Sequence, residues 1–147
     1  MTSNPVGAAR ALVAGHGTFA SGLIAAAAAI TGRDDMFIAL SNAGHGAADI
    51  ERIIREHVDE RGVELIFTDL PAGSCALAAR RVIRDRPQLL LVTGANLAAL
   101  LDFALHAGRS PGEAARHAVD RAREAIGVFG GQAPTPPPPP KDGGTAR

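Results

Sequence analysis

Residues 11–32 read ALVAGHGTFASGLIAAAAAITG and contain the parts of one strand, turn and helix unit. Ala11–Gly15 is a short apolar run, which is typical of a buried strand. Phe19–Gly32 has helical spacing and ends at a glycine, where helices commonly stop. Glycines on both sides of His16 let the chain turn tightly from the strand into the helix. The stretch therefore predicts a strand and a helix with a histidine in the turn between them.

The same order of elements recurs along the chain. Three further apolar runs are predicted strands: Met36–Leu40, Val63–Asp69 and Gln88–Gly94. A stretch with helical spacing follows each of them: Ala47–Gly62, Ser74–Pro87 and Asn96–Gly108. This alternation predicts an α/β fold, a three-layer sandwich with a mainly parallel open sheet and helices on both faces. Right-handed crossovers favour the strand order 2-1-3-4, with a fifth strand at one edge left open.

Two segments complete the chain after the fourth repeat. Ser110–Phe129 is predicted as a fifth helix, with Ser110 as N-cap, Pro111 at the first helical position and Glu113 three residues after the cap. From Gly130 the composition changes to GGQAPTPPPPPKDGGTAR, which has no apolar periodicity. We therefore expect one globular domain over 1–129 and a Pro/Gly-rich disordered tail or linker stub over 130–147.

Composition excludes several classes of function. The chain has 147 residues, is 46% hydrophobic, and balances 15 Lys and Arg against 15 Asp and Glu. The basic residues are scattered rather than gathered into a patch with aromatics, which disfavours nucleic-acid binding. No apolar run approaches the length of about 20 residues that spans a membrane, and no signal peptide is recognisable, so we expect a cytoplasmic protein without membrane insertion. Cys75 is the single cysteine, which excludes an intrachain disulfide and a multi-cysteine zinc cluster.

The tetrapeptide AGHG occurs twice, so His16 and His45 have equal local claims to be reactive. Strand order separates them, because ligands of open parallel sheets bind beyond the strand ends where the order reverses, here between the first and third strands. The first strand ends at His16 and the third at Asp69, so both side chains should line one crevice. His45 follows the second strand and is expected to line the rim or to make a turn.

The predicted pair of His16 and Asp69 suits one kind of chemistry. A carboxylate bonded to one ring nitrogen fixes the tautomer and leaves the other nitrogen free to attack. Helices starting near Thr18 and Ser74 should point unpaired backbone N–H groups into the crevice, which forms an anion site. The arrangement fits a histidine that accepts a phosphoryl group, although a loop histidine beside an acid is also a common structural pair.

The motifs AGHGTFASG and TDLPAGSCALAAR resemble the enzyme IIA domain of the mannose family in the bacterial phosphoenolpyruvate-dependent sugar phosphotransferase system. The resemblance runs from about Ala11 to Gly108. It implies that His16 is phosphorylated, that Asp69 orients it, and that Gly73 and Ser74 form the phosphate-facing start of a helix. Gly17 and Thr18, at the other helix start, complete the candidate phosphate-binding residues, and no metal or cofactor is expected.

The resemblance also implies partners and a reaction. Such a phosphotransferase component forms a phosphohistidine intermediate, receives the phosphoryl group from a histidine-containing phosphocarrier protein, and passes it to a IIB component. Members of the family are typically homodimers. Three residues depart from the family's loop after the third strand: Pro71, Ala72 and Cys75. Two related alternatives are a regulatory module that senses phosphotransferase state and the phosphotransferase subunit of dihydroxyacetone kinase.

Other classes of function are less consistent with the sequence. GHGTFA fits the dinucleotide-binding pattern, but FIALSN supplies no acidic residue at the end of the second strand to hold a ribose. A metal site needs His16, His45 and a carboxylate to converge, and single histidines in separate loops lack the paired spacing typical of zinc sites. Ser21 and Ser74 lack the G-x-S-x-G elbow of serine hydrolases.

Overall fold

The computed structural model describes residues 10–132 and 136–140. Strands and helices alternate up to the fourth helix, as the apolar runs predict, and a fifth helix follows. Their bounds are β1 Ala11–Gly15, α1 Phe19–Thr31, β2 Phe37–Ser41, α2 Ala47–Arg61, β3 Leu65–Thr68, α3 Ser74–Asp85, β4 Leu90–Val92, α4 Leu97–Leu105 and α5 Pro111–Glu124.

The strands form one parallel sheet in the order β2-β1-β3-β4, which confirms the predicted order. Gly15 at the end of β1 pairs with Ser41 at the end of β2. On the other side of β1, Ala14 pairs with Thr68 at the end of β3. The carboxyl ends of the three strands therefore meet at one edge of the sheet, and the turns that follow them lie together.

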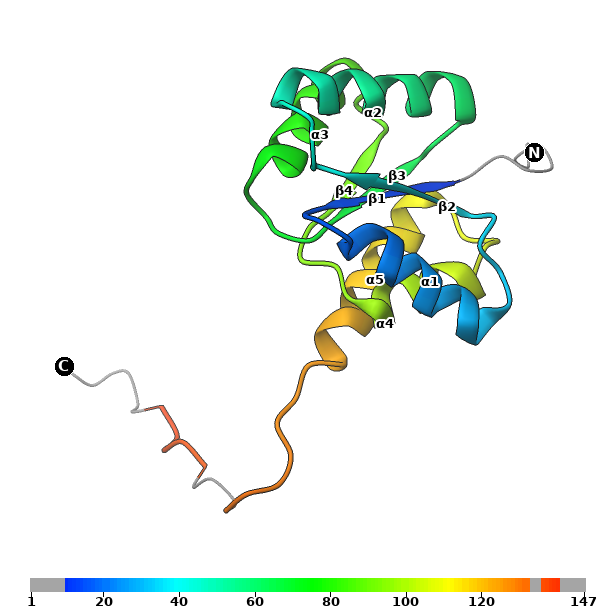
Figure 1. Cartoon of the computed structure of the whole chain (residues 1–147). Helices are drawn as coiled ribbons and strands as arrows, with labels where there is room; N and C mark the ends of the chain where they lie inside the picture. The colour runs from blue at the N-terminus through cyan, green and yellow to red at the C-terminus, as the bar shows by residue number, and fades with distance from the viewer. Residues whose placement is uncertain (1–9, 133–135, 141–147) are drawn as a thin grey trace.

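Helices cover both faces of the sheet (Figure 1). In this view α2 and α3 lie above it, and α1, α4 and α5 lie below it. The side chains of β1 alternate between the two layers: Ala11 and Val13 pack toward the core with α4 and α5, whereas Leu12 and Ala14 pack toward α2 and α3. Because both faces are covered, the strands consist of continuous apolar runs.

Several helix ends follow the sequence signals. Gly32 and Gly62 end α1 and α2 in the left-handed conformation, with φ of 75° and 71°. Ser110 and Glu113 form a reciprocal capping box at the start of α5, which begins at Pro111. The predicted stop and start signals of these helices are therefore confirmed.

The predicted fifth helix is too long, because α5 ends at Glu124 rather than at Phe129. Its buried face consists of four alanines, the last of which is Ala122: Ala114, Ala115, Ala118 and Ala122. After that alanine the chain leaves the core, and Ile126, Val128 and Phe129 are 76%, 96% and 96% exposed. Helical structure without a packed face is marginal in water, and Gly127 weakens it further.

The described residues contain four strands and no fifth edge strand. Residues 130–132 and 136–140 form neither helix nor strand. The remaining parts of the predicted tail, 133–135 and 141–147, lie outside the described residues, so the domain boundary at residue 129 stays a prediction. Within the described part of the chain, none of the helices has the length and apolar character required to cross a bilayer.

Candidate active site

His16 and Asp69 meet at the carboxyl edge of the sheet. The Nδ1 atom of His16 lies 2.8 Å from Oδ2 of Asp69, and the backbone N–H of His16 donates to the same oxygen at 2.9 Å. Since a carboxylate only accepts, the ring N–H on Nδ1 is the donor. In the neutral ring with the proton on Nδ1, the second nitrogen, Nε2, carries the lone pair. The His16 side chain is 55% exposed, so other molecules can reach the ring.

The absence of a side chain at Gly15 makes this contact possible. A Cβ atom at Gly15 would lie 2.7 Å from Cδ2 of Phe19 and 2.9 Å from Cγ and Oδ2 of Asp69. The Phe19 ring and the Asp69 carboxylate thus occupy the space that the Cβ atom of any other residue at position 15 would need. The sequence predicts that this glycine makes a tight turn, but its φ lies outside the left-handed region, and its role is to allow the close approach of Asp69 and Phe19.

Asp69 is fixed by the end of β3. Thr68 is fully buried, and its hydroxyl donates to the carbonyl of Leu70 at 2.9 Å across Asp69. Partial burial raises the pKa of the Asp69 carboxyl, but hydrogen bonds from the side chain and backbone of His16 outweigh it. The net pKa lies below the usual value of 3.8. Asp69 is therefore ionised at neutral pH and supplies a negative charge beside the ring.

Asn42 holds the other side of the His16 turn, a role that its sequence context did not predict. Its backbone N–H donates to the carbonyl of Gly15 at 3.0 Å, and its side-chain Oδ1 accepts from the N–H of Gly17 at 3.3 Å. The turn is therefore held from both flanking loops, through Asn42 after β2 and Asp69 after β3. The available signal was position, since Asn42 directly follows a strand at the same edge as His16.

The four candidate phosphate-binding residues differ in how they can contribute to the site of His16. Gly73 has a φ of 113°, and a Cβ atom there would lie 3.8 Å from Cε1 of His16. Ser74 begins α3, and Thr18 precedes α1; neither helix has a side-chain cap on its first N–H groups. The N–H of Phe19, the first of α1, already donates to the carbonyl of His16 at 3.0 Å, so the first N–H groups of α3 are the better candidates to hold an anion. The N–H of Gly17 is likewise engaged, by Asn42.

His45 does not join the pair. Its backbone N–H donates to the carbonyl of Asn42 at 3.1 Å and closes the turn after β2, and its side chain is exposed. Within residues 10–132 and 136–140, no ion pair or hydrogen bond joins His45 to His16, and no three His, Cys, Asp or Glu residues are placed to hold a metal ion.

Cys75 lies one residue inside α3 and is buried. Burial, followed by the negative charge of Asp69, raises the pKa of its thiol above the usual value of 9.0. The thiol is therefore protonated at neutral pH, and Cys75 is a poor nucleophile. Its role next to the site is packing against the α2 and α3 side of the sheet.

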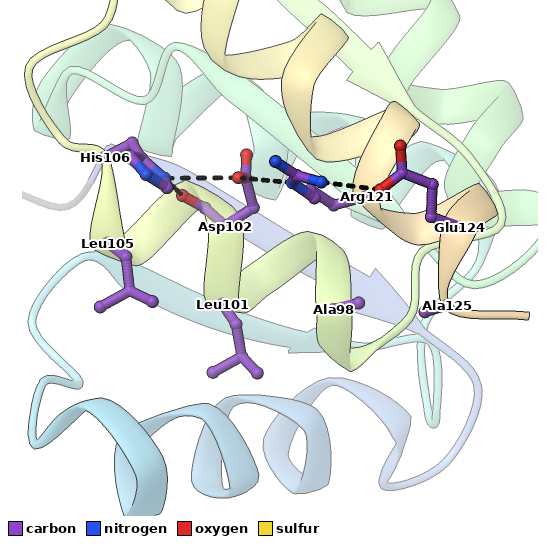
Figure 2. A pocket seen from close by; sticks show the side chains of 8 residues that line it. All are labelled: Ala98, Leu101, Asp102, Leu105, His106, Arg121, Glu124 and Ala125. Carbon is purple, nitrogen blue, oxygen red and sulfur yellow. Dashed lines mark hydrogen bonds and ion pairs between the residues drawn. The ribbon is translucent and has the colours of Figure 1, made fainter.

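A groove of about 370 Å³ lies elsewhere, between α4 and α5 (Figure 2). Asp102, 6% exposed, stands in it and is paired with His106 at 3.3 Å, Arg109 at 3.2 Å and Arg121 at 3.9 Å. Arg10, which precedes β1, donates to the carbonyl of Ala107 at 2.7 Å, so this end of α4 lies at the sheet edge opposite His16. The groove is therefore separate from the His16 site, and its charges neutralise one another.

Comparison with known proteins adds to this geometry. The family described as PTS system fructose IIA component, EIIA-man, matches residues 10–120. That range includes the four strands, helices α1 to α4 and most of α5, together with His16 and Asp69. A search of curated protein sequences gives no match.

Solved structures of similar fold carry related descriptions. The mannose/sorbose specific IIA subunit of the phosphotransferase system from Enterococcus faecalis is 23% identical, with a TM-score of 0.74, and the match covers 87% of this chain and 99% of that one. The PTS IIA protein associated with the fucose utilization operon from Streptococcus pneumoniae is 24% identical, with a TM-score of 0.71, covering 82% and 93%. Phosphotransferase system component EIIA from Streptococcus agalactiae is 18% identical, with a TM-score of 0.73, covering 82% and 96%.

At these identities the structural likeness establishes the fold, an open parallel α/β sheet. The match of the family over residues 10–120 spans most of the chain and establishes membership. The chain belongs to the EIIA-man family, the IIA components of the sugar phosphotransferase system.

Proposed function

We propose that this protein is a phosphoryl carrier that is phosphorylated reversibly on Nε2 of His16. The donor is a histidine-containing phosphocarrier protein, and the acceptor is a IIB component. The observation that carries the proposal is the contact of 2.8 Å between Nδ1 of His16 and Oδ2 of Asp69. It occupies Nδ1 of the ring and leaves Nε2, on a side chain that is 55% exposed, without this partner.

The transfer is a displacement at phosphorus. Nε2 of His16 forms a bond to the phosphorus of the donor's phosphohistidine, the donor's P–N bond breaks, and its electron pair stays on the donor's ring nitrogen. The His16 ring becomes positively charged as the new bond forms. The ionised Asp69 stabilises that charge through the N–H on Nδ1.

Backbone groups complete the proposed site. The uncapped N–H groups at the start of α3, from Ser74 onward, are suited to hold the oxygens of the transferred phosphoryl group. Gly73 lets this helix start approach the ring edge. Transfer to a IIB component reverses the same steps, with His16 as the leaving group.

The test uses phosphoenolpyruvate, enzyme I and the phosphocarrier protein from the same organism. Wild-type protein should gain one acid-labile phosphate by mass spectrometry, and His16→Ala should gain none. His45→Ala is a matched control, because it removes the histidine of the second AGHG turn, and it should be labelled like wild type. Label that persists in His16→Ala, or no label in wild type, would contradict the proposal.

A homodimer in the cytoplasm is part of the same proposal. The family resemblance suggests the dimer. The exposed side chains of Ile126, Val128 and Phe129 support it, because contiguous exposed apolar side chains mark sites of protein–protein contact. The outer edge of β4 has no neighbouring strand among the described residues, so it also offers a surface to a second copy. The cytoplasm is where phosphoenolpyruvate supplies the phosphoryl group.

A further inference from the structure

Thr68 places a hydroxyl group inside an apolar layer at the end of β3. Leu65 and Phe67 pack on the side of α4 and α5, whereas Ile66 packs on the side of α2 and α3. By the same alternation Thr68 faces α2 and α3, beside Ala14, with which it pairs in the sheet. Thr68 is 0% exposed. A buried hydroxyl costs free energy unless it is hydrogen-bonded, so its bonding partner is part of its role.

The hydroxyl of Thr68 holds the turn that carries Asp69. It donates to the carbonyl of Leu70, two residues further along the chain, at 2.9 Å. Such short bonds from a threonine to nearby backbone fix the conformation of a turn. Thr68 is itself anchored, because its carbonyl accepts from the N–H of Ala95 at 2.9 Å. Pro71 adds a second restraint, since it keeps Leu70 out of helical conformations.

Asp69 has little room to move within this turn. A Cβ atom at position 15 would lie 2.9 Å from its Cγ and Oδ2, so the carboxylate already lies against the backbone of Gly15. Burial raises the pKa of the Asp69 carboxyl, and the bonds from His16, with a smaller one from the backbone of Leu70, lower it. Leu70 therefore connects the two side chains: its N–H donates to Asp69, and its carbonyl accepts from Thr68.

We infer that Thr68 is a positioning residue for phosphoryl transfer. Acting through Leu70 and Asp69, its hydroxyl keeps the proton of the neutral His16 ring on Nδ1 and the lone pair on Nε2. The kinetic part of this inference rests on the proposed function. Without the hydroxyl, the turn samples several conformations, the contact between Asp69 and His16 is broken in part of the population, and the proton moves to Nε2 there. A ring with its proton on Nε2 has no lone pair at that atom to attack phosphorus.

Two variants separate the hydroxyl of Thr68 from its methyl group. Valine has the shape of threonine without the hydroxyl, whereas serine keeps the hydroxyl and loses the methyl. In rapid-quench transfer from the phosphorylated carrier, Thr68→Val should lower the maximal rate roughly tenfold and leave KM within about twofold of wild type. Thr68→Ser should transfer within about twofold of the wild-type rate.

Stability should rank the same two variants in the opposite order. Thr68→Ser should lower the midpoint of thermal unfolding more than Thr68→Val, because serine leaves a methyl-sized space in a packed layer. If Thr68 served the fold alone, the transfer rate would follow stability, and Thr68→Ser would be the slower variant. That ranking would overturn the inference.

Thr31→Val is the matched control. The Thr31 hydroxyl also donates to a backbone carbonyl at 2.9 Å, that of Ala27, but it lies at the last residue of α1 rather than beside the site. The control loses the same kind of bond and should transfer within about twofold of the wild-type rate.

Nitrogen NMR of the His16 ring reads the tautomer without any phosphoryl donor. At a pH where the ring is neutral, wild type and Thr68→Ser should carry the proton on Nδ1, and Thr68→Val should show a mixture of the two tautomers. The same tautomer in Thr68→Val as in wild type would refute the inference.

A small donor separates positioning of the ring from binding of the carrier. In phosphoramidate, Nε2 of His16 forms a bond to phosphorus, the P–N bond breaks, and its electron pair stays on the nitrogen, which leaves as ammonia after gaining a proton. Phosphoramidate should label Thr68→Val more slowly than wild type by a factor similar to that of the carrier. A defect with the carrier alone would contradict the inference. If neither donor labels wild type, the proposed function fails, and the tautomer comparison decides the role of Thr68 by itself.

Discussion

One oxygen atom of Asp69 accepts two hydrogen bonds from His16, at 2.8 Å from the ring Nδ1 and 2.9 Å from the backbone N–H. The shared acceptor ties the orientation of the ring to the position of the backbone that carries it. The rotation of the ring is therefore already restricted when a phosphoryl donor approaches Nε2.

Asp69→Asn should slow phosphoryl transfer to His16 by about 100-fold without unfolding the domain. The amide oxygen can still accept both bonds from His16, but the negative charge that stabilises the positive ring is lost. Rapid-quench transfer from the phosphorylated carrier measures the rate, and thermal unfolding measures the fold. Transfer at the wild-type rate would remove the role given to the Asp69 charge.

The pH dependence of stability should also report Asp69. Its pKa is lowered below 3.8 in the folded protein, so its contribution is complete above 3.8 and is lost as the pH falls through the lowered value. The free energy of unfolding of wild type should therefore fall more steeply than that of Asp69→Asn between neutral pH and about pH 2. Urea unfolding across that range tests this, and parallel curves would contradict it.

Gly15→Ala should destabilise the protein by about 1–3 kcal/mol and displace Asp69 or Phe19, because its Cβ atom would overlap both. Gly22→Ala is the matched control in α1, where a Cβ atom meets nothing within 4 Å. That change should stabilise the helix by about 0.5–1 kcal/mol. Chemical denaturation measures both values, and equal effects of the two substitutions would refute the close-approach role of Gly15.

Asn42→Ala should lower the transfer rate by roughly three- to tenfold, because the turn of His16 loses the bond between Gly17 N–H and Asn42 Oδ1. Ser41→Ala is the control, since the Ser41 hydroxyl accepts from Ala43 within the same loop and does not contact the His16 turn. Labelling by phosphoramidate and by the carrier should slow together in Asn42→Ala. If only carrier-dependent transfer slows, Asn42 contacts the partner instead of positioning the ring.

Val128→Asp/Phe129→Asp should convert the proposed homodimer to monomer, since both side chains are 96% exposed in the single chain and require cover. Light scattering coupled to size-exclusion chromatography measures the mass. Ile30→Asp, at an exposed apolar position of α1, is the control and should leave the mass unchanged. A wild-type monomer, or a dimer that survives the double substitution, would contradict the proposed assembly.

The order of elements and of strands was predictable because the strands are short apolar runs, and Gly32, Gly62 and Pro87 mark the ends of the helices between them. Strand order in turn placed His16 beside Asp69, although the two residues are far apart in sequence. The end of α5 was not predictable from periodicity. Ile126, Val128 and Phe129 continue an apolar pattern, but no described element lies opposite them to bury it.

The supporting contacts of the site were also beyond the sequence. Asn42 acts through one side-chain oxygen whose partner is 25 residues away, and asparagine after a strand is equally common in plain turns. Outside the site, the pairing of Asp102 was equally unpredictable, because this residue lies in an apolar helix and its partners, His106, Arg109 and Arg121, come from three different positions after folding. Such contacts depend on side-chain geometry across elements, which residue spacing does not encode.

The buried thiol of Cys75 can report local opening of the protein at α3. It is the single sulfhydryl of the chain, it is 3% exposed, and it sits at the first turn of the helix that faces His16. A thiol reagent can modify it only when α3 separates locally from the sheet. The rate of modification therefore measures how often α3 opens, without any engineered label. Comparing the rate before and after phosphorylation of His16 would reveal whether loading the histidine tightens or loosens that helix.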